Sequence, residues 1–156
     1  MLLPLVIGID LWIRWQVWRR RQDARPLTVV EQCPLEGLFP DSVLSDVRVV
    51  EGTPPLPPGL GLIGRFRPSW VVMQPTGITF GRTIVIEPDQ LGRPGLLFHE
   101  LVHVVQWRYL GRLRFLLAYA LGILQSGYRE SPLEDVAYRM TEDNLAWSDA
   151  QAQDPG

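Results

Sequence analysis

The sequence predicts an α+β fold in which a small mixed or antiparallel sheet precedes a helix that carries two histidines, followed by two further helices. Short apolar runs separated by turn residues occupy the first half of the chain, which is typical of strands. A long apolar segment follows at residues 96–107, and two more helical patterns come after it. With 156 residues, of which 46% are hydrophobic, the chain suffices for one domain with a real core.

The first 25 residues are an apolar, tryptophan-rich segment. Residues 2–13 are apolar apart from Asp10, and an arginine triplet follows the tryptophans Trp12, Trp15 and Trp18. The uncharged stretch is shorter than the about 20 residues that span a bilayer. Two interpretations stay open: a helix at a membrane surface, where indoles and arginines meet lipid head groups, or a helix packed on the rest of the protein. Residues 26–156 are predicted to be a single domain. If the N-terminal segment anchors at a membrane, its arginines favour a cytoplasmic location for this domain.

The strands are predicted from alternating and β-branched runs. Residues 27–37 are expected to form a poorly defined helix or an extended piece, whereas residues 47–50 alternate like a strand. The proline-rich residues 53–59 predict a loop, because proline fixes φ and lacks the backbone donor. Further strands are expected at residues 60–66, 70–74, 78–80 and 83–87, with turns at 75–77 and 81–82.

The histidine-bearing helix contains the most informative motif of the chain. His99 and His103 are the only histidines, and their spacing places them on one helix face, so that both imidazoles can reach one cation. Glu100 lies about 100° around the helix from His99, where a carboxylate can accept a proton from water without binding the metal. The surrounding residues are apolar, and burying these polar groups without a partner is costly. The segment therefore predicts a metal site.

Two helical segments follow. Residues 113–124 are strongly apolar but too few to span a bilayer, which favours a core helix against the histidine helix over membrane contact. A last helix is expected from about residue 133 towards residue 147. Ser131 is a candidate N-cap with Pro132 at the first helical position.

The third metal ligand is expected near the start of this last helix. Glu134 follows Ser131 at the spacing of a capping box, so it is either a ligand or a cap of its own helix, and Glu130 and Asp135 compete for the ligand role. Gln106 lies on the same side as His103 and is either an orienting group or a plain core amide. Candidates for stabilising an oxyanion are Tyr128, Arg129, Tyr138 and Arg139.

Two parts of the chain carry a family resemblance. The runs TFGRTIVI (79–86) and LFHELVHVVQ (97–106) resemble the small metallopeptidase-like domain found beside bacterial extracellular contractile injection systems. There, a strand with a TFG-type turn precedes a helix carrying HELxHxxQ. More broadly, the region is similar to gluzincins, the thermolysin-like zincins, whose third zinc ligand is a glutamate on a later helix. The resemblance covers about residues 76–138 and implies a zincin-like fold.

The resemblance implies a specific set of functional residues. His99, His103 and Glu134 correspond to zinc ligands, and Glu100 corresponds to the general base of a peptidase. A peptide or protein substrate is then expected, and residues 83–86 are expected to pair with an extended peptide by β-augmentation or to be an ordinary edge strand.

Composition and chemistry leave two rivals from other classes. One is a metal-stabilised binding or scaffold module without turnover, with or without association with a membrane through residues 1–25. The other is a non-haem iron enzyme, which is disfavoured because Glu100 then has no task. The net charge of −2 gives no electrostatic footprint for nucleic acid. Cys33 is the only cysteine, which excludes an intrachain disulfide.

Overall fold

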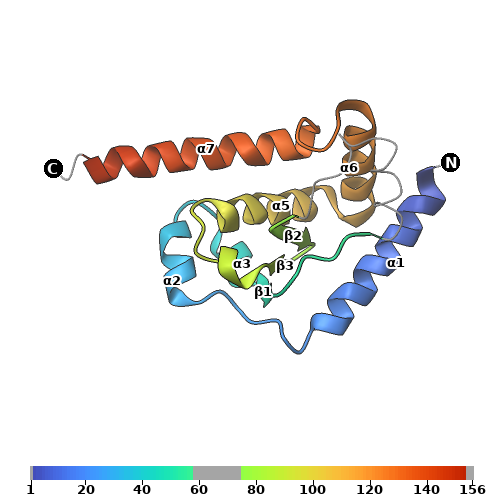
Figure 1. Ribbon diagram of the computed structural model, residues 1–156, viewed down its shortest axis with the longest axis horizontal. Helices are drawn as coiled ribbons and strands as arrows, with labels where there is room; N and C mark the ends of the chain where they lie inside the picture. Colours follow the sequence, from blue (N-terminus) through green and yellow to red (C-terminus); the bar gives the residue numbers. More distant parts are fainter. Residues whose placement is uncertain (1, 58–74, 154–156) are drawn as a thin grey trace.

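The computed structural model describes residues 2–57 and 75–153, in which a small sheet is surrounded by helices (Figure 1). The strands are β1 (Arg48–Glu51), β2 (Gly77–Phe80) and β3 (Thr83–Ile86). The longer helices are α1 (Leu2–Arg20), α5 (Leu96–Leu110), α6 (Arg112–Ser126) and α7 (Pro132–Gln153). Short helical segments are α2 (Val29–Gln32), η1 (Cys33–Leu35), α3 (Asp41–Leu44) and η3 (Pro88–Gln90). The predicted α+β class is confirmed for these residues.

The three strands form a mixed sheet in the order β1-β3-β2. β1 runs parallel to β3, with Val49 opposite Ile84, and β2 runs antiparallel to β3, with Thr79 opposite Ile84. The expectation that residues 83–86 are an edge strand, free to pair with a peptide, is therefore wrong. All four residues of β3 are buried, as expected for a central strand with both faces covered.

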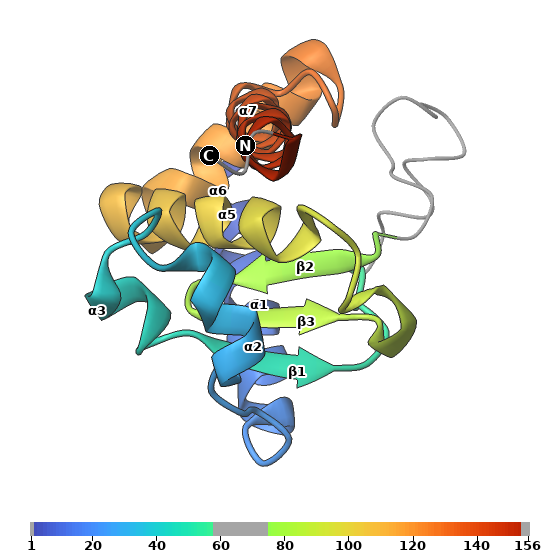
Figure 2. The same cartoon turned by 90° about the vertical axis from the view of Figure 1, so that its left-hand side faces the viewer.

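Alternation along β3 divides the interior into two cores. Successive side chains of a strand point to opposite faces. Ile84 and Ile86 enter one core together with Leu101 of α5. Val85, between them, enters a second core with Ile13 of α1. Figure 2 shows α2 in front of the sheet, α1 behind it and α5 along the β2 side, so that both faces of the sheet are covered.

The N-terminal helix is part of the folded body. Val6 and Ile13 of α1 are buried against residues of the sheet, α5 and α6. Beyond the helix, the backbone of Arg25 exchanges two hydrogen bonds with Val49 of β1, at 2.9 and 2.8 Å. This packing agrees with the interpretation of residues 1–25 as a helix packed on the rest of the protein. Among the described residues, no helix combines the length and the apolar character needed to cross a bilayer.

Helix α6 packs where a core helix was expected. Its Phe115 stacks on Trp107 of α5, with ring centroids 4.2 Å apart. The poorly defined region at residues 27–37 contains α2 and η1, and α2 begins with a reciprocal capping box between Thr28 and Glu31. The strands expected at residues 60–66 and 70–74 lie outside the described residues.

Candidate metal centre

Helix α5 brings the two histidines together. The helix starts after Gly95, whose φ of +78° favours glycine because it has no side chain. His99 and His103 follow within the first turns, one turn apart, and their exposed fractions are only 8% and 6%. Their Nε2 atoms lie 3.1 Å from each other. The spacing in the sequence thus predicted the placement of both imidazoles.

Glu134 of α7 is the acid that meets this pair. Its side chain is 1% exposed, and its two carboxylate oxygens lie 3.4 Å from the Nε2 atoms of His99 and His103, respectively. The competing acids point elsewhere, because Glu130 is exposed and Asp135 pairs with Arg139. Three side chains from two helices therefore converge in one buried place.

The alternative role of Glu134 as a helix cap is not realised. The backbone N–H of Ser131 donates to the carbonyl oxygen of Tyr128 instead of to the Glu134 carboxylate. The hydroxyl of Ser131 is buried and has no hydrogen-bond partner in the described part of the chain. The capping-box spacing is present in the sequence, but the carboxylate turns inward to the histidines.

The donor set fits a divalent metal ion. Ligands held at about 2.0–2.1 Å around a tetrahedral zinc are separated from one another by about 3.3 Å. The distances of 3.1, 3.4 and 3.4 Å between the three side chains match that separation. Oε2 of Glu134 is buried without a hydrogen-bond partner among the described residues, and a buried carboxylate oxygen without a partner is costly. A cation bound between these donors removes that cost.

Gln106 fixes the orientation of His103. Its amide nitrogen donates to the carbonyl oxygen of Leu133 at 2.9 Å, so its Oε1 faces Nδ1 of His103 at 2.8 Å as an acceptor. The Nδ1 atom of the imidazole then carries the proton, and the lone pair of a neutral ring is left on Nε2, on the side of Glu134. The role of Gln106 as an orienting group, rather than a plain core amide, follows from these two contacts.

Burial and charge shape the protonation of the cluster. Burial disfavours a charged His103, but its hydrogen bond and proximity to Glu134 outweigh that effect and raise the pKa of His103 to about 8. Burial also disfavours the charged carboxylate of Glu134, yet contacts with His103 and His99 hold its pKa well below the usual range. The carboxylate is therefore ionised at neutral pH, as a metal ligand must be.

Glu100 is buried beside the cluster but is not among its donors. It is 4% exposed, and the hydroxyl of Thr79 donates to its Oε2 at 2.7 Å. A Cβ atom on Gly77 would lie only 2.6 Å from Oε1 of Glu100, so this carboxylate position requires a glycine on β2. Burial raises the pKa of Glu100, and the nearby histidines and Thr79 oppose that effect. A carboxyl with a raised pKa suits proton transfer near neutral pH.

Sequence reasoning missed one close contact of the cluster. The hydroxyl of Tyr119, on α6, donates to Oε1 of Glu134 at 2.7 Å. No spacing rule connects a tyrosine in an apolar helix with an acid on the next one. Of the residues proposed to stabilise an oxyanion, Tyr138 packs on His99 with ring centroids 4.6 Å apart, and Arg129 lies over the Tyr138 ring at 4.1 Å.

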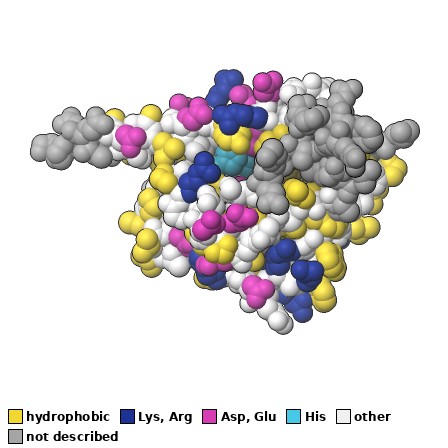
Figure 3. All heavy atoms as spheres, viewed as in Figure 1, with side chains coloured by type: hydrophobic (Ala, Val, Ile, Leu, Met, Phe, Trp, Pro, Cys, Tyr) yellow, Lys and Arg dark blue, Asp and Glu magenta, His cyan; other side chains and the backbone are white. Residues whose placement is uncertain are grey.

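Two pockets meet at Glu100. One, of about 130 Å³, is mainly apolar and is lined by Ile78, Phe115 and Tyr119 as well as by His103 and Glu134. The other, of about 380 Å³, is lined by His99 and Tyr138. Glu100 and Gly77 line both pockets. Histidine atoms are visible at the molecular surface below α7 (Figure 3), so the cluster is reached from outside.

Comparisons with known proteins add no further identification. No protein-family profile, curated protein or solved structure matches the chain.

Proposed function

We propose that this protein is a zinc-dependent hydrolase of the gluzincin kind that cleaves peptide bonds. In this proposal His99, His103 and Glu134 hold the metal, and Glu100 is the general base. The observation that carries it is the convergence of two imidazoles and a carboxylate from separate helices at distances of 3.1–3.4 Å, beside a second buried carboxylate that is not among them. A metal site used only for stability has no need of that second acid.

Zinc bound at this site would supply Lewis-acid polarisation of a carbonyl group and a lowered pKa for water. Glu100 acts next to it through Oε1, because Oε2 is already engaged by the Thr79 hydroxyl. Oε1 accepts the proton of the attacking water and then returns it to the leaving amine. Tyr119 and Gln106 hold Glu134 and His103 in place through hydrogen bonds.

A peptide substrate is supported by the shape of the surroundings. The two pockets share Glu100, Pro75 and Gly77 in their linings. A chain lying across Gly77 places one residue towards the apolar pocket and its neighbour towards the larger one. The preference for a peptide over other acyl compounds rests on analogy with the metallopeptidase family that residues 76–138 resemble.

Metal analysis and a matched pair of variants test the proposal. Purified protein is expected to contain about one zinc per chain. Cleavage of a proteome-derived peptide library is measured by mass spectrometry, and a chelator is expected to abolish that cleavage. Glu100→Gln is expected to keep the metal and to reduce turnover by at least about 100-fold. Glu130→Gln, at an exposed position close to α7, is the control and is expected to leave both metal content and turnover unchanged.

The same measurements identify the rival functions. If the protein holds zinc but cleaves nothing, and Glu100→Gln is indistinguishable from the wild type, the protein is a scaffold module. Iron in place of zinc removes the peptidase proposal. Loss of metal in Glu130→Gln, with metal retained in Glu134→Gln, shows that the assignment of the third ligand is wrong.

A further inference from the structure

A third pocket, larger than the two at Glu100, lies away from the histidines. It has a volume of about 670 Å³ and is formed by α1, the β2–β3 turn, α5 and α6. One aspartate lines it, Asp46, whereas the arginines that line it are Arg14, Arg21, Arg82, Arg108 and Arg112. The chain as a whole has a net charge of −2, so this is a local concentration of positive charge. Such a pocket attracts anions.

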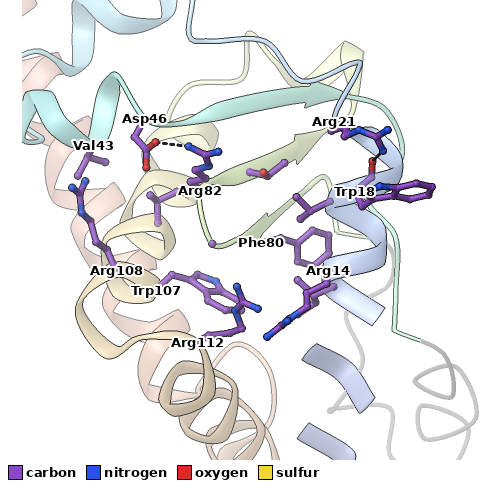
Figure 4. Close-up of a pocket in the computed structure, with 15 residues that line it drawn as sticks. Arg14, Trp18, Arg21, Val43, Asp46, Phe80, Arg82, Trp107, Arg108 and Arg112 are labelled. Carbon is purple, nitrogen blue, oxygen red and sulfur yellow. Dashed lines mark hydrogen bonds and ion pairs between the residues drawn. The ribbon is translucent and has the colours of Figure 1, made fainter. Parts of the chain in front are cut away.

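A buried acid lies within ion-pair distance of two of these arginines, and it accepts a hydrogen bond from one of them, Arg14. Asp10 of α1 is 6% exposed, and its carboxylate lies 3.0 Å from Nε of Arg14 and 3.4 Å from Nε of Arg112. Both contacts use the inner nitrogen of the guanidinium group. No hydrogen bond from the outer nitrogens of Arg14 or Arg112 is found among the described residues, and Figure 4 shows both side chains reaching towards the space beside Trp107. The four outer amino groups are therefore available to an anion.

The wall of the pocket contains a further donor without a partner. Trp107 of α5 is 7% exposed, and its indole Nε1 is buried with no hydrogen-bond partner in the described parts of the chain. An indole N–H can only donate, and a buried donor without an acceptor is costly. Ile13, Val17 and Phe80 supply the apolar part of the same wall. The pocket is thus suited to an anionic group with an apolar portion attached.

The outer face of α1 continues from the pocket as an apolar surface. One face of α1 packs on the protein, but Ile7, Leu11, Trp15 and Trp18 on the other side are 45–60% exposed. Arg19 lies over the Trp15 ring at 5.1 Å, and Arg21 lies over the Trp18 ring at 4.6 Å. Figure 3 shows basic and hydrophobic side chains next to one another around the lower end of α1. Exposed indoles with adjacent arginines are typical of proteins that lie at a membrane interface.

We propose that this surface binds a membrane containing anionic phospholipids. Arg14 and Arg112, oriented by Asp10, bind the phosphate of a lipid head group in the pocket, and Trp15 and Trp18 enter the interfacial layer beside it. Trp18 belongs to both the pocket and the exposed face, which makes the two features one continuous surface. The apolar face is what favours a lipid over free phosphate, because a soluble anion makes no use of it.

Vesicle co-sedimentation of the full chain tests this proposal. Phosphatidylcholine vesicles are compared with vesicles in which part of the phosphatidylcholine is replaced by phosphatidylglycerol. Binding is expected only to the second kind and is expected to weaken as sodium chloride is added, because salt screens the attraction. Binding of inorganic phosphate, a soluble anion, is measured by calorimetry for comparison. Equal binding to both vesicles, binding of phosphate without vesicles, or no binding at all overturns the proposal.

Two pairs of substitutions locate the binding surface. Arg14→Gln with Arg112→Gln is expected to weaken binding to the anionic vesicles about tenfold to thirtyfold. Because this pair leaves Asp10 without its charged partners, Arg21→Gln with Arg82→Gln is the second test, and it leaves the Asp10 contacts intact. Arg129→Gln with Arg139→Gln is the control at residues that do not line the pocket. If the control pair weakens binding as much as both test pairs, the pocket is not the site.

Discussion

Tyr119 and Glu134 join helices α6 and α7 through a hydrogen bond of 2.7 Å between the phenol hydroxyl and Oε1. Burial raises the pKa of Tyr119 well above the ordinary value, so that the hydroxyl remains a donor throughout the working pH range. The carboxylate also faces His99 and His103. One apolar helix therefore contributes a polar contact that holds the third donor of the cluster in position.

Tyr119→Phe is expected to weaken zinc binding about 10-fold to 100-fold, because loss of a hydrogen bond to a metal ligand commonly has that effect. Zinc affinity is measured by competition with a chelator of known affinity. Tyr109→Phe, at a position on α5 that is 88% exposed, is the control. An unchanged affinity in Tyr119→Phe contradicts the role given to this contact.

Gly77→Ala is expected to reduce turnover about 100-fold, the effect of displacing a reacting group by about 1 Å. The added Cβ would lie 2.6 Å from Oε1 of Glu100, and the buried carboxylate has to move away. Metal content is expected to remain, because Glu100 is not among the donors. Gly92→Ala, where the new Cβ meets nothing within 4 Å, is the control and should match the wild type. Full activity of Gly77→Ala removes Glu100 as the base.

Thr79→Val is expected to move the acidic limb of the kcat/KM profile to higher pH. The Thr79 hydroxyl donates to Oε2 of Glu100 and so favours the ionised carboxylate. Without that donor, the pKa of Glu100 rises further, and the base is protonated at a higher pH. Thr79→Ser keeps the donor and is expected to restore the wild-type profile. A uniform loss of rate at every pH indicates a packing effect instead.

The sequence pattern predicted those features of the site that depend on one helix. His99 and His103 share a face because a helix repeats about every 3.6 residues, and their apolar surroundings indicated that the face is buried. The same reasoning placed Gln106 beside His103. For Glu134, the capping-box spacing and the ligand role were both compatible with the residues, and only the tertiary packing of α7 on α5 decides between them.

The features that the sequence did not predict depend on contacts between elements. β3 is central because β1 and β2 pair with its two edges. The residue pattern of a single strand does not determine the order of the strands in a sheet. The three consecutive apolar residues of β3, Ile84, Val85 and Ile86, were nevertheless compatible with a strand buried on both faces. Tyr119 lies in an apolar run that predicts only core packing, so its contact with Glu134 emerges only once α6 and α7 are placed.

Glu31→Gln is expected to lower the free energy of unfolding by about 1–2 kcal/mol at neutral pH, the range for a hydrogen-bonded charge pair that is partly open to solvent. Hydrogen bonds from Arg25 are the main cause that lowers the pKa of Glu31 from 4.5 to about 2, while burial opposes it. Because the folded-state pKa is the lower one, this stabilisation is fully present above about pH 4.5 and is lost as the pH falls towards 2.

Urea unfolding at a series of pH values checks this sign. The difference between wild type and Glu31→Gln is expected to be constant near neutral pH and to shrink as the pH falls from 4.5 to about 2. Glu36→Gln, at an exposed position nearby, is expected to show no such difference at any pH. Arg25 also pairs with Glu51 of β1 at 2.9 Å, so Arg25→Gln removes both pairs and should destabilise the protein more than Glu31→Gln does. A difference that grows on acidification contradicts the assignment, because it requires Glu31 to be more easily protonated in the folded state than in the unfolded chain.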